Sequence, residues 1–226
     1  MSFNLADFFS LAGTVFSLIL GFTPIVPFTQ VLKKEEKIEI LPEGMLISTI
    51  IARILYLSIW TVKKLIIPSI NSASGILISS TFFIIYLYLY YQKCHSKFIS
   101  ILIFLLAAIF LYVGGVLIQL KIGFDLGTLA MIFNVMMYVT PGQKIRRVIK
   151  EKNYKLIPIW STIVSALCSL FWLLYGICIK FLPSIVPNVL GLLFSIINSV
   201  VWLVFYLKSD KIEDKDEKLN IEMKET

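Results

Sequence analysis

The stretch YVTPGQKIRRVIKEKNYKLIP at residues 138–158 decides the fold, together with two motifs that follow it, LFWLLYG at 170–176 and VPNVLG at 186–191. The same landmarks occur earlier in the chain in the same order: proline, basic loop, second proline, bulky aromatic residue, asparagine, glycine and a span rich in tyrosine and phenylalanine. The chain therefore contains an internal repeat. The segments of the looser first copy are GFTPIVPFTQVLKKEEKIEILP at 21–42, ILYLSIW at 54–60 and SINSASG at 69–75.

Composition places both copies in a membrane. The 226 residues are 58% hydrophobic and only 15% charged, and their mean hydropathy is +0.87, whereas water-soluble domains keep far more charge. Apolar windows of about 20 residues, the length needed to cross a hydrocarbon core of about 30 Å, recur along the chain. We expect seven spans, at approximately Asp7 to Thr29, Glu43 to Val62, Leu65 to Tyr91, Phe98 to Leu120, Phe124 to Lys144, Pro158 to Lys180 and Pro183 to Leu207.

Each copy of the repeat holds three of these spans and one span separates the copies, so both copies enter the membrane with the same orientation. The sequence thus predicts an all-α membrane protein in which two parallel three-helix repeats are joined by a linker helix (3+1+3). The last stretch carries alternating charges and cannot form a core, so we expect it to be disordered. The expected domains are a first repeat at 5–92, a linker helix at 97–120, a second repeat at 123–207 and a cytosolic tail at 208–226.

Charge indicates the orientation. When the loops are assigned alternately to two sides, most of the 21 lysines and arginines fall on one side, in the loops near 33–37 and 144–155 and in the tail. The positive-inside rule then predicts an amino terminus outside and a carboxyl terminus in the cytosol. The net charge of +7 reflects this topology and attraction to anionic lipid, so nucleic acid is not an expected partner. We expect an integral multi-pass protein of the plasma membrane or of an endomembrane such as the Golgi or a vesicle, with homo-oligomerisation left open.

Four motifs of the second copy resemble those of the SWEET (MtN3/saliva) family of sugar transporters, in the same order and spacing. MYVTPGQ resembles the family's MYxSPL segment, KLIP its loop-ending proline, FWLLYG its Trp-x-x-Tyr-Gly run and PNVLG its Pro-Asn-x-x-Gly. The resemblance covers roughly Phe8 to Leu207. It implies a sugar transporter built on a parallel repeat.

Two prolines in each copy lie near the expected cytosolic ends of spans. A proline in a membrane helix removes a backbone donor and can serve as a hinge. The resemblance implies that these four residues form an inner gate: Pro24, Pro42, Pro141 and Pro158. Pro27 is an additional proline of the first copy and competes with Pro24 for the place in this ring.

Asn188 lies in an otherwise apolar span, where its amide needs a polar partner from another helix or from a cargo. A sugar suits this need, because its hydroxyls donate and accept while an aromatic face covers its C–H surface. The resemblance implies that Trp172 and Asn188 bind the substrate. In the first copy, spacing places Tyr56 opposite Trp172, and Asn71 is the expected partner of Asn188, with Ser72 as the competing alignment. Alternatively, the asparagines join helices and Trp172 belongs to an interfacial aromatic belt.

Two further residues match family positions near the extracellular gate, Gly176 and Pro187. Small or rigid residues there permit close helix approach. Phe181 departs from the family pattern, because an acidic residue commonly stands at its position.

Arg53 is the one cation expected inside a span. It faces a cavity, pairs with a backbone carbonyl, or extends its head group toward the membrane surface. The acids Asp7, Glu43 and Asp125 fall at span ends, whereas a proton-coupled transporter usually needs a titratable group near the midplane. We therefore expect a bidirectional uniporter that moves mono- or disaccharides by facilitated diffusion and alternating access.

Other classes of protein fit the sequence less well. No span offers a Ser/His, paired-Asp or HExxH set, and neither the three cysteines nor the single histidine has the spacing of a metal site, so we expect no enzyme, no catalytic residues, no metal and no cofactor. A PQ-loop-type amino acid transporter shares the 3+1+3 plan, but the chain contains no Pro-Gln dipeptide. A seven-helix receptor would be expected to lack the parallel repeat.

Overall fold

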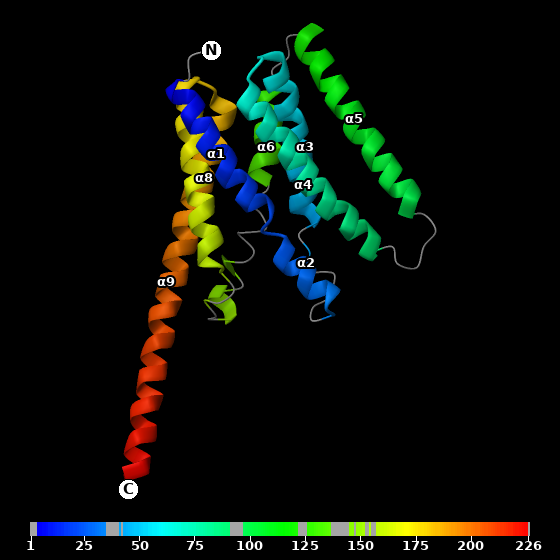
Figure 1. Ribbon diagram of the computed structural model, residues 1–226. Coiled ribbons are helices and arrows are strands. Elements are labelled where there is room, and N and C mark those ends of the chain that lie inside the picture. Colours follow the sequence, from blue (N-terminus) through cyan, green and yellow to red (C-terminus); the bar gives the residue numbers. More distant parts are fainter. Residues whose placement is uncertain are drawn as a thin grey trace.

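The computed structural model of the chain describes residues 4–34, 41, 43–90, 97–121, 126–136, 145–146, 148–151, 154 and 157–225; the side chains of 97–101 and 209–225 are outside this description. Within these ranges the chain is built from helices, without strands (Figure 1). Six helical segments of the described residues are long and apolar enough to cross a membrane, and Gly127–Met136 is a shorter apolar helix. The prediction of an all-α membrane protein is confirmed.

The first span is one segment broken at Pro24. Proline has no N–H to donate to the Leu20 carbonyl, four residues earlier. Thr23 supplies donors instead, with its backbone N–H at 3.0 Å and its hydroxyl at 2.8 Å from that carbonyl. The helices of the first repeat are therefore α1 (Leu5–Gly21), α2 (Ile25–Leu32), α3 (Glu43–Val62) and α4 (Ile66–Tyr90).

The rest of the chain forms the linker helix and the second repeat. The predicted span from Phe124 to Lys144 is described only over α6, and its remainder lies outside the described residues. The last helix continues past Leu207, so the segment 208–225, predicted to be disordered, is helical in the structure. No proline or glycine follows Gly191, and this segment is rich in Lys and Glu, which favour helices. These helices are α5 (Lys97–Lys121), α6 (Gly127–Met136), α8 (Ile159–Cys178) and α9 (Leu182–Glu225).

Helix packing repeats between the two halves. In the first repeat α4 packs against α1 and α3, and in the second α9 packs in the same way against α6 and α8. The halves meet through α1 with α8 and through α3 with α6, which are equivalent pairs if the repeats are related by a twofold axis. The linker helix α5 packs on α3 and α4, where Gly115 of α5 leaves room for the Ser58 hydroxyl of α3. This arrangement confirms the predicted 3+1+3 fold.

Matching turns fix the register between the repeats. The backbone N–H of Leu65 donates to the Trp60 carbonyl at 3.0 Å, and that of Phe181 donates to the Gly176 carbonyl at 2.9 Å. The residue before each donor, a lysine in both cases, has a left-handed backbone conformation. Both turns are therefore helix ends of the Schellman type. Continuing along α4 and α9 without a gap, the equivalent pairs are Asn71 with Pro187, Ser72 with Asn188, and Gly75 with Gly191.

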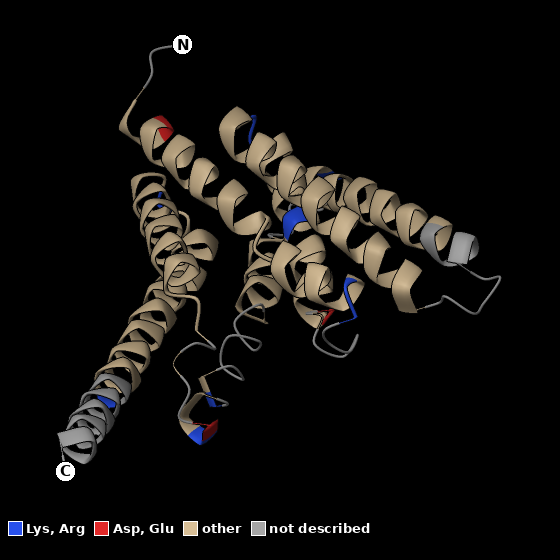
Figure 2. Ribbon diagram, turned by 60° about the horizontal axis from the view of Figure 1, so that its bottom comes forward, with Lys and Arg blue, Asp and Glu red and all other residues tan. Residues whose placement is uncertain are grey.

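The outer surface of the helices suits lipid. Figure 2 shows charged residues mainly at the ends of helices, with long uncharged stretches between them. Large apolar side chains are exposed on these stretches, among them Phe110 of α5, which is 81% exposed. Such exposure is unfavourable in water and favourable in a hydrocarbon core.

Candidate functional site

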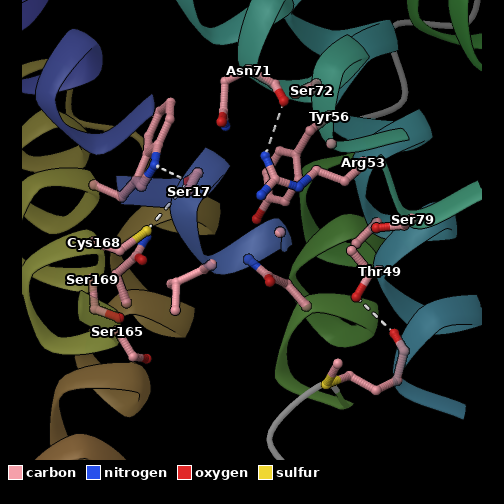
Figure 3. Close-up of a pocket in the computed structure, with 18 of the residues that line it drawn as sticks. Ser17, Thr49, Arg53, Tyr56, Asn71, Ser72, Ser79, Ser165, Cys168 and Ser169 are labelled. Carbon is pink, nitrogen blue, oxygen red and sulfur yellow. Dashed lines mark hydrogen bonds between the residues drawn. The ribbon is translucent and has the colours of Figure 1, made fainter. Parts of the chain in front are cut away.

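A cavity of about 210 Å³ lies between the two repeats. Its walls come from α1, α3 and α4 of the first repeat and from α6, α8 and α9 of the second (Figure 3). The four residues predicted to bind substrate come from four different helices, and all of them line this cavity: Trp172, Asn188, Asn71 and Tyr56.

Trp172 forms an aromatic wall of the cavity and is only 8% exposed. Its indole Nε1 donates a hydrogen bond to the Ser17 hydroxyl at 3.0 Å, and its ring meets that of Tyr175 edge-on with the centroids 5.4 Å apart. Gly13 of α1 makes this position possible, because a Cβ there would lie 2.9 Å from Nε1. The indole is therefore held between the repeats and not in an aromatic belt at the membrane surface.

The asparagines differ in how their amides are satisfied. Asn188 donates from Nδ2 to the Ser184 carbonyl one turn earlier, at 2.6 Å. Asn71 is 5% exposed, and its Oδ1 has no hydrogen-bond partner in the described part of the chain. Because a buried polar atom without a partner costs about 1–3 kcal/mol, this oxygen is well placed to accept a hydrogen bond from a ligand. Ser72 also lines the cavity, so both alternatives for the partner of Asn188 reach it.

Arg53 lines the same cavity, and its Nη1 donates to the backbone carbonyl of Asn71 at 3.3 Å. Gly75 leaves space for the guanidinium, since a Cβ there would lie 3.0 Å from Cζ of Arg53. Two of the three alternatives drawn from the sequence are thus both observed: the side chain faces the cavity and pairs with a backbone carbonyl.

Aromatic side chains close the cavity toward the α3–α4 and α8–α9 turns. Tyr56 and Trp60 stack with their centroids 5.8 Å apart, and Trp60 meets Phe181 edge-on at 5.0 Å. The Lys63 ammonium lies 4.6 Å from the centre of the Phe181 ring, within the range of a cation–π interaction. Aromatic and cation–π contacts therefore surround Phe181, the residue that departs from the pattern expected from the sequence.

A hydrogen bond joins the repeats at this closed end. The Tyr56 hydroxyl donates to the Pro183 carbonyl at 2.6 Å. In a regular α-helix that carbonyl would receive the N–H of residue 187, but Pro187, which is fully buried, has none. Pro187 thus leaves the Pro183 carbonyl without a donor from α9, and the Tyr56 hydroxyl of the first repeat donates to it instead. Gly176 lies close by, and a Cβ there would be 3.0 Å from Cγ1 of Ile185, so the glycine lets α8 and α9 approach closely.

The predicted ring of prolines is only partly described. Pro24 lines the cavity, whereas Pro27 lies within α2 away from its walls. Pro158 is the N-cap of α8. Pro42 and Pro141 lie outside the described residues, so the ring of four stays a prediction.

The sequence alone did not single out the small polar residues on the cavity walls. On α8 they follow a helical spacing, with Ser165, Cys168, Ser169 and Trp172 on one face. That spacing is a signal that could have found them, because it places a polar stripe along an apolar span. The other small polar residues that line the cavity include Ser17, Thr49, Ser79 and Asn134.

Comparisons with known proteins agree with this architecture. The family model described as "Sugar efflux transporter for intercellular exchange" matches residues 124–210. The chain is also 28% identical to "Bidirectional sugar transporter SWEET12" of Oryza sativa subsp. japonica over 203 residues. This match covers 86% of this chain and 66% of that protein. The family model thus matches the second repeat, and this relative extends the similarity to SWEET transporters over most of the chain.

Other SWEET relatives match with different coverage. "Bidirectional sugar transporter SWEET5" of Arabidopsis thaliana is 33% identical over 94 residues, which are 41% of this chain and 39% of that protein. "Bidirectional sugar transporter SWEET10" of the same plant is 24% identical over 222 residues, which are 92% of this chain and 73% of that protein. The solved structure of a eukaryotic SWEET transporter superposes with a TM-score of 0.73 at 18% identity, over 89% of this chain and 96% of that one. At that identity the solved structure supports the fold alone.

Proposed function

We propose that this protein is a SWEET-type transporter and a bidirectional sugar uniporter. The observation that carries this proposal is the cavity between the repeats. An aromatic face at Trp172 and amides at Asn71 and Asn188 meet there. Such a combination suits a sugar, whose C–H surface packs on an aromatic ring while its hydroxyls bond to amides. The names of the relatives as bidirectional sugar transporters support the same function.

The size of the cavity favours a small cargo. Pockets for drug-sized ligands have volumes of about 300–1,000 Å³, whereas this one measures about 210 Å³. A single sugar unit therefore fits better than a disaccharide in this conformation.

Two features support alternating access: the cavity is closed at the end of the α3–α4 and α8–α9 turns, and the two repeats have the same fold. We infer that the repeats at 5–92 and 123–207 rock against each other, with 97–120 as the linker, and that Tyr56, Trp60 and Phe181 separate when the outer side opens. The four prolines then serve as hinges of the inner gate. The charge pattern supports an outside amino terminus and a cytosolic carboxyl terminus, in the plasma membrane or an endomembrane.

Transport without a coupled proton is the expected mode. None of the described residues that line the cavity is acidic, and a coupled transporter usually needs such a group within the membrane. In proteoliposomes, uptake of labelled glucose down a fixed gradient should therefore continue at the same rate after a protonophore is added. Unlabelled glucose on the far side should exchange with it, as expected for a carrier that works in both directions. Uptake that collapses with the proton gradient would contradict uniport.

A further inference from the structure

The cavity holds a positive charge that a neutral sugar does not require. Arg53 lines the cavity across from Ser17 and Cys168 of the opposite wall (Figure 3). Its guanidinium has five N–H donors, and among the described residues its one hydrogen bond is that from Nη1 to the Asn71 carbonyl. The titratable groups that act on it are Cys168 and Tyr56, and neither is a carboxylic acid. The charge is therefore without a counter-ion in the described part of the chain.

This charge breaks the symmetry of the repeats. By the register of the two turns, the equivalent of Arg53 on α3 is Ser169 on α8, and both line the cavity. Gly75 accommodates the guanidinium against α4. A charge inside a membrane is unfavourable unless it is paired or serves the cargo. The second repeat forms the same three-helix fold with an uncharged serine at this position, so the fold does not require the charge of Arg53.

We propose that the preferred substrate of this chain is a single sugar unit that carries a carboxylate, with the carboxylate bound by Arg53 and the ring against Trp172. This inference rests on the proposed function. The planar guanidinium matches a carboxylate with two parallel N–H···O bonds. Arg53 donates to the backbone carbonyl of Asn71, and the side chain of Asn71 lines the same cavity. Its Oδ1 has no hydrogen-bond partner in the described part of the chain and can accept from a sugar hydroxyl.

A carboxylate fits this site better than a phosphate. Arg53 contributes one positive charge, which balances the single negative charge of a sugar acid, whereas a phosphate monoester carries about −1.5 to −2 at pH 7. No other lysine or arginine of the described residues lines the cavity. A phosphorylated sugar would leave negative charge unbalanced inside the membrane.

The test measures uptake of labelled glucuronate, glucose and glucose 6-phosphate by the full-length protein in proteoliposomes. We expect wild type to transport glucuronate, and Arg53→Gln to lower the ratio of glucuronate to glucose uptake by at least about tenfold, because a charge-assisted bidentate pair is lost. Arg53→Lys keeps the charge without the fork and should give an intermediate ratio. Lys121→Gln, which removes a cation at the end of α5, is the matched control and should keep the wild-type ratio.

Each outcome either supports this inference or overturns it. Wild type that moves glucose but not glucuronate, or a ratio that Arg53→Gln leaves unchanged, overturns this inference and leaves the proposed function standing. Arg53-dependent uptake of glucose 6-phosphate without glucuronate overturns the choice of a carboxylate. Absence of uptake for all three sugars overturns both this inference and the proposed function. If Arg53→Gln fails to fold, the ratio in Arg53→Lys decides in the same way.

Discussion

Trp172→Ala is expected to reduce labelled-glucose flux in proteoliposomes by at least about tenfold, because it removes the aromatic wall of the cavity and the contacts that hold it there. The indole bonds to Ser17 and packs edge-on against Tyr175. Its loss also leaves an empty volume beside Gly13, where the ring now lies in contact with α1.

Truncation of a buried tryptophan destabilises a protein by about 3–5 kcal/mol, so a second variant separates binding from folding. Trp172→Phe keeps an aromatic face but loses the Nε1 donor to Ser17. Its flux should lie between those of wild type and Trp172→Ala, with a size-exclusion profile like that of wild type. Wild-type flux in a folded Trp172→Ala protein would remove this residue from the site.

Tyr56→Phe is expected to open the cavity at the α3–α4 and α8–α9 turns, which is the outer end in the proposed orientation. The variant leaves the Pro183 carbonyl without the hydroxyl that now donates to it at 2.6 Å. An unpaired buried acceptor costs about 1–3 kcal/mol, which corresponds to a shift of about 5- to 150-fold in the balance between closed and open states. Cys168 is buried beside the cavity and reports this opening. In a background with Cys94→Ser and Cys178→Ser, a membrane-impermeant maleimide added outside should label Cys168 roughly tenfold faster in the Tyr56→Phe variant.

Pro187→Ala tests whether the Pro183 carbonyl depends on the Tyr56 hydroxyl because Pro187 has no N–H. With alanine at this position, the N–H of residue 187 can donate to the Pro183 carbonyl within α9. The effect of Tyr56→Phe on labelling should then shrink, which a double-mutant cycle measures. Equal effects in the two backgrounds would mean that the hydroxyl closes the cavity by some other contact.

Much of the fold follows from the sequence, since span length and apolar composition are local properties. The bounds of α3 agree with the predicted span, and the repeat of landmarks predicts the equivalent packing of the two halves. The break at Pro24 follows from its missing N–H. The tail was predicted less well: its charge pattern excludes a core, but the same residues sustain a helix that continues from α9.

The sequence could single out individual residues that the structure places on the cavity wall, but it could not specify contacts that depend on how two helices meet. Trp172 and Asn188 stand out in the sequence because each belongs to a short motif, FWLLYG and PNVLG. The bond from Tyr56 to the Pro183 carbonyl depends on how α3 meets α9, which no local pattern specifies. Arg53 was left with three alternatives, because the space that Gly75 provides on α4 is a tertiary property.

Asn188→Ala tests the central claim most directly, that sugar crosses through the cavity between the repeats. The amide of Asn188 lines that cavity with its Nδ2 bonded to the Ser184 carbonyl, so alanine removes a polar contact for the cargo and leaves α9 intact. Val189→Ala on the exposed face of the same helix is the matched control. Labelled-sugar flux in proteoliposomes should fall at least about tenfold for Asn188→Ala and stay at the wild-type level for the control. Wild-type flux through the Asn188→Ala protein would contradict the account.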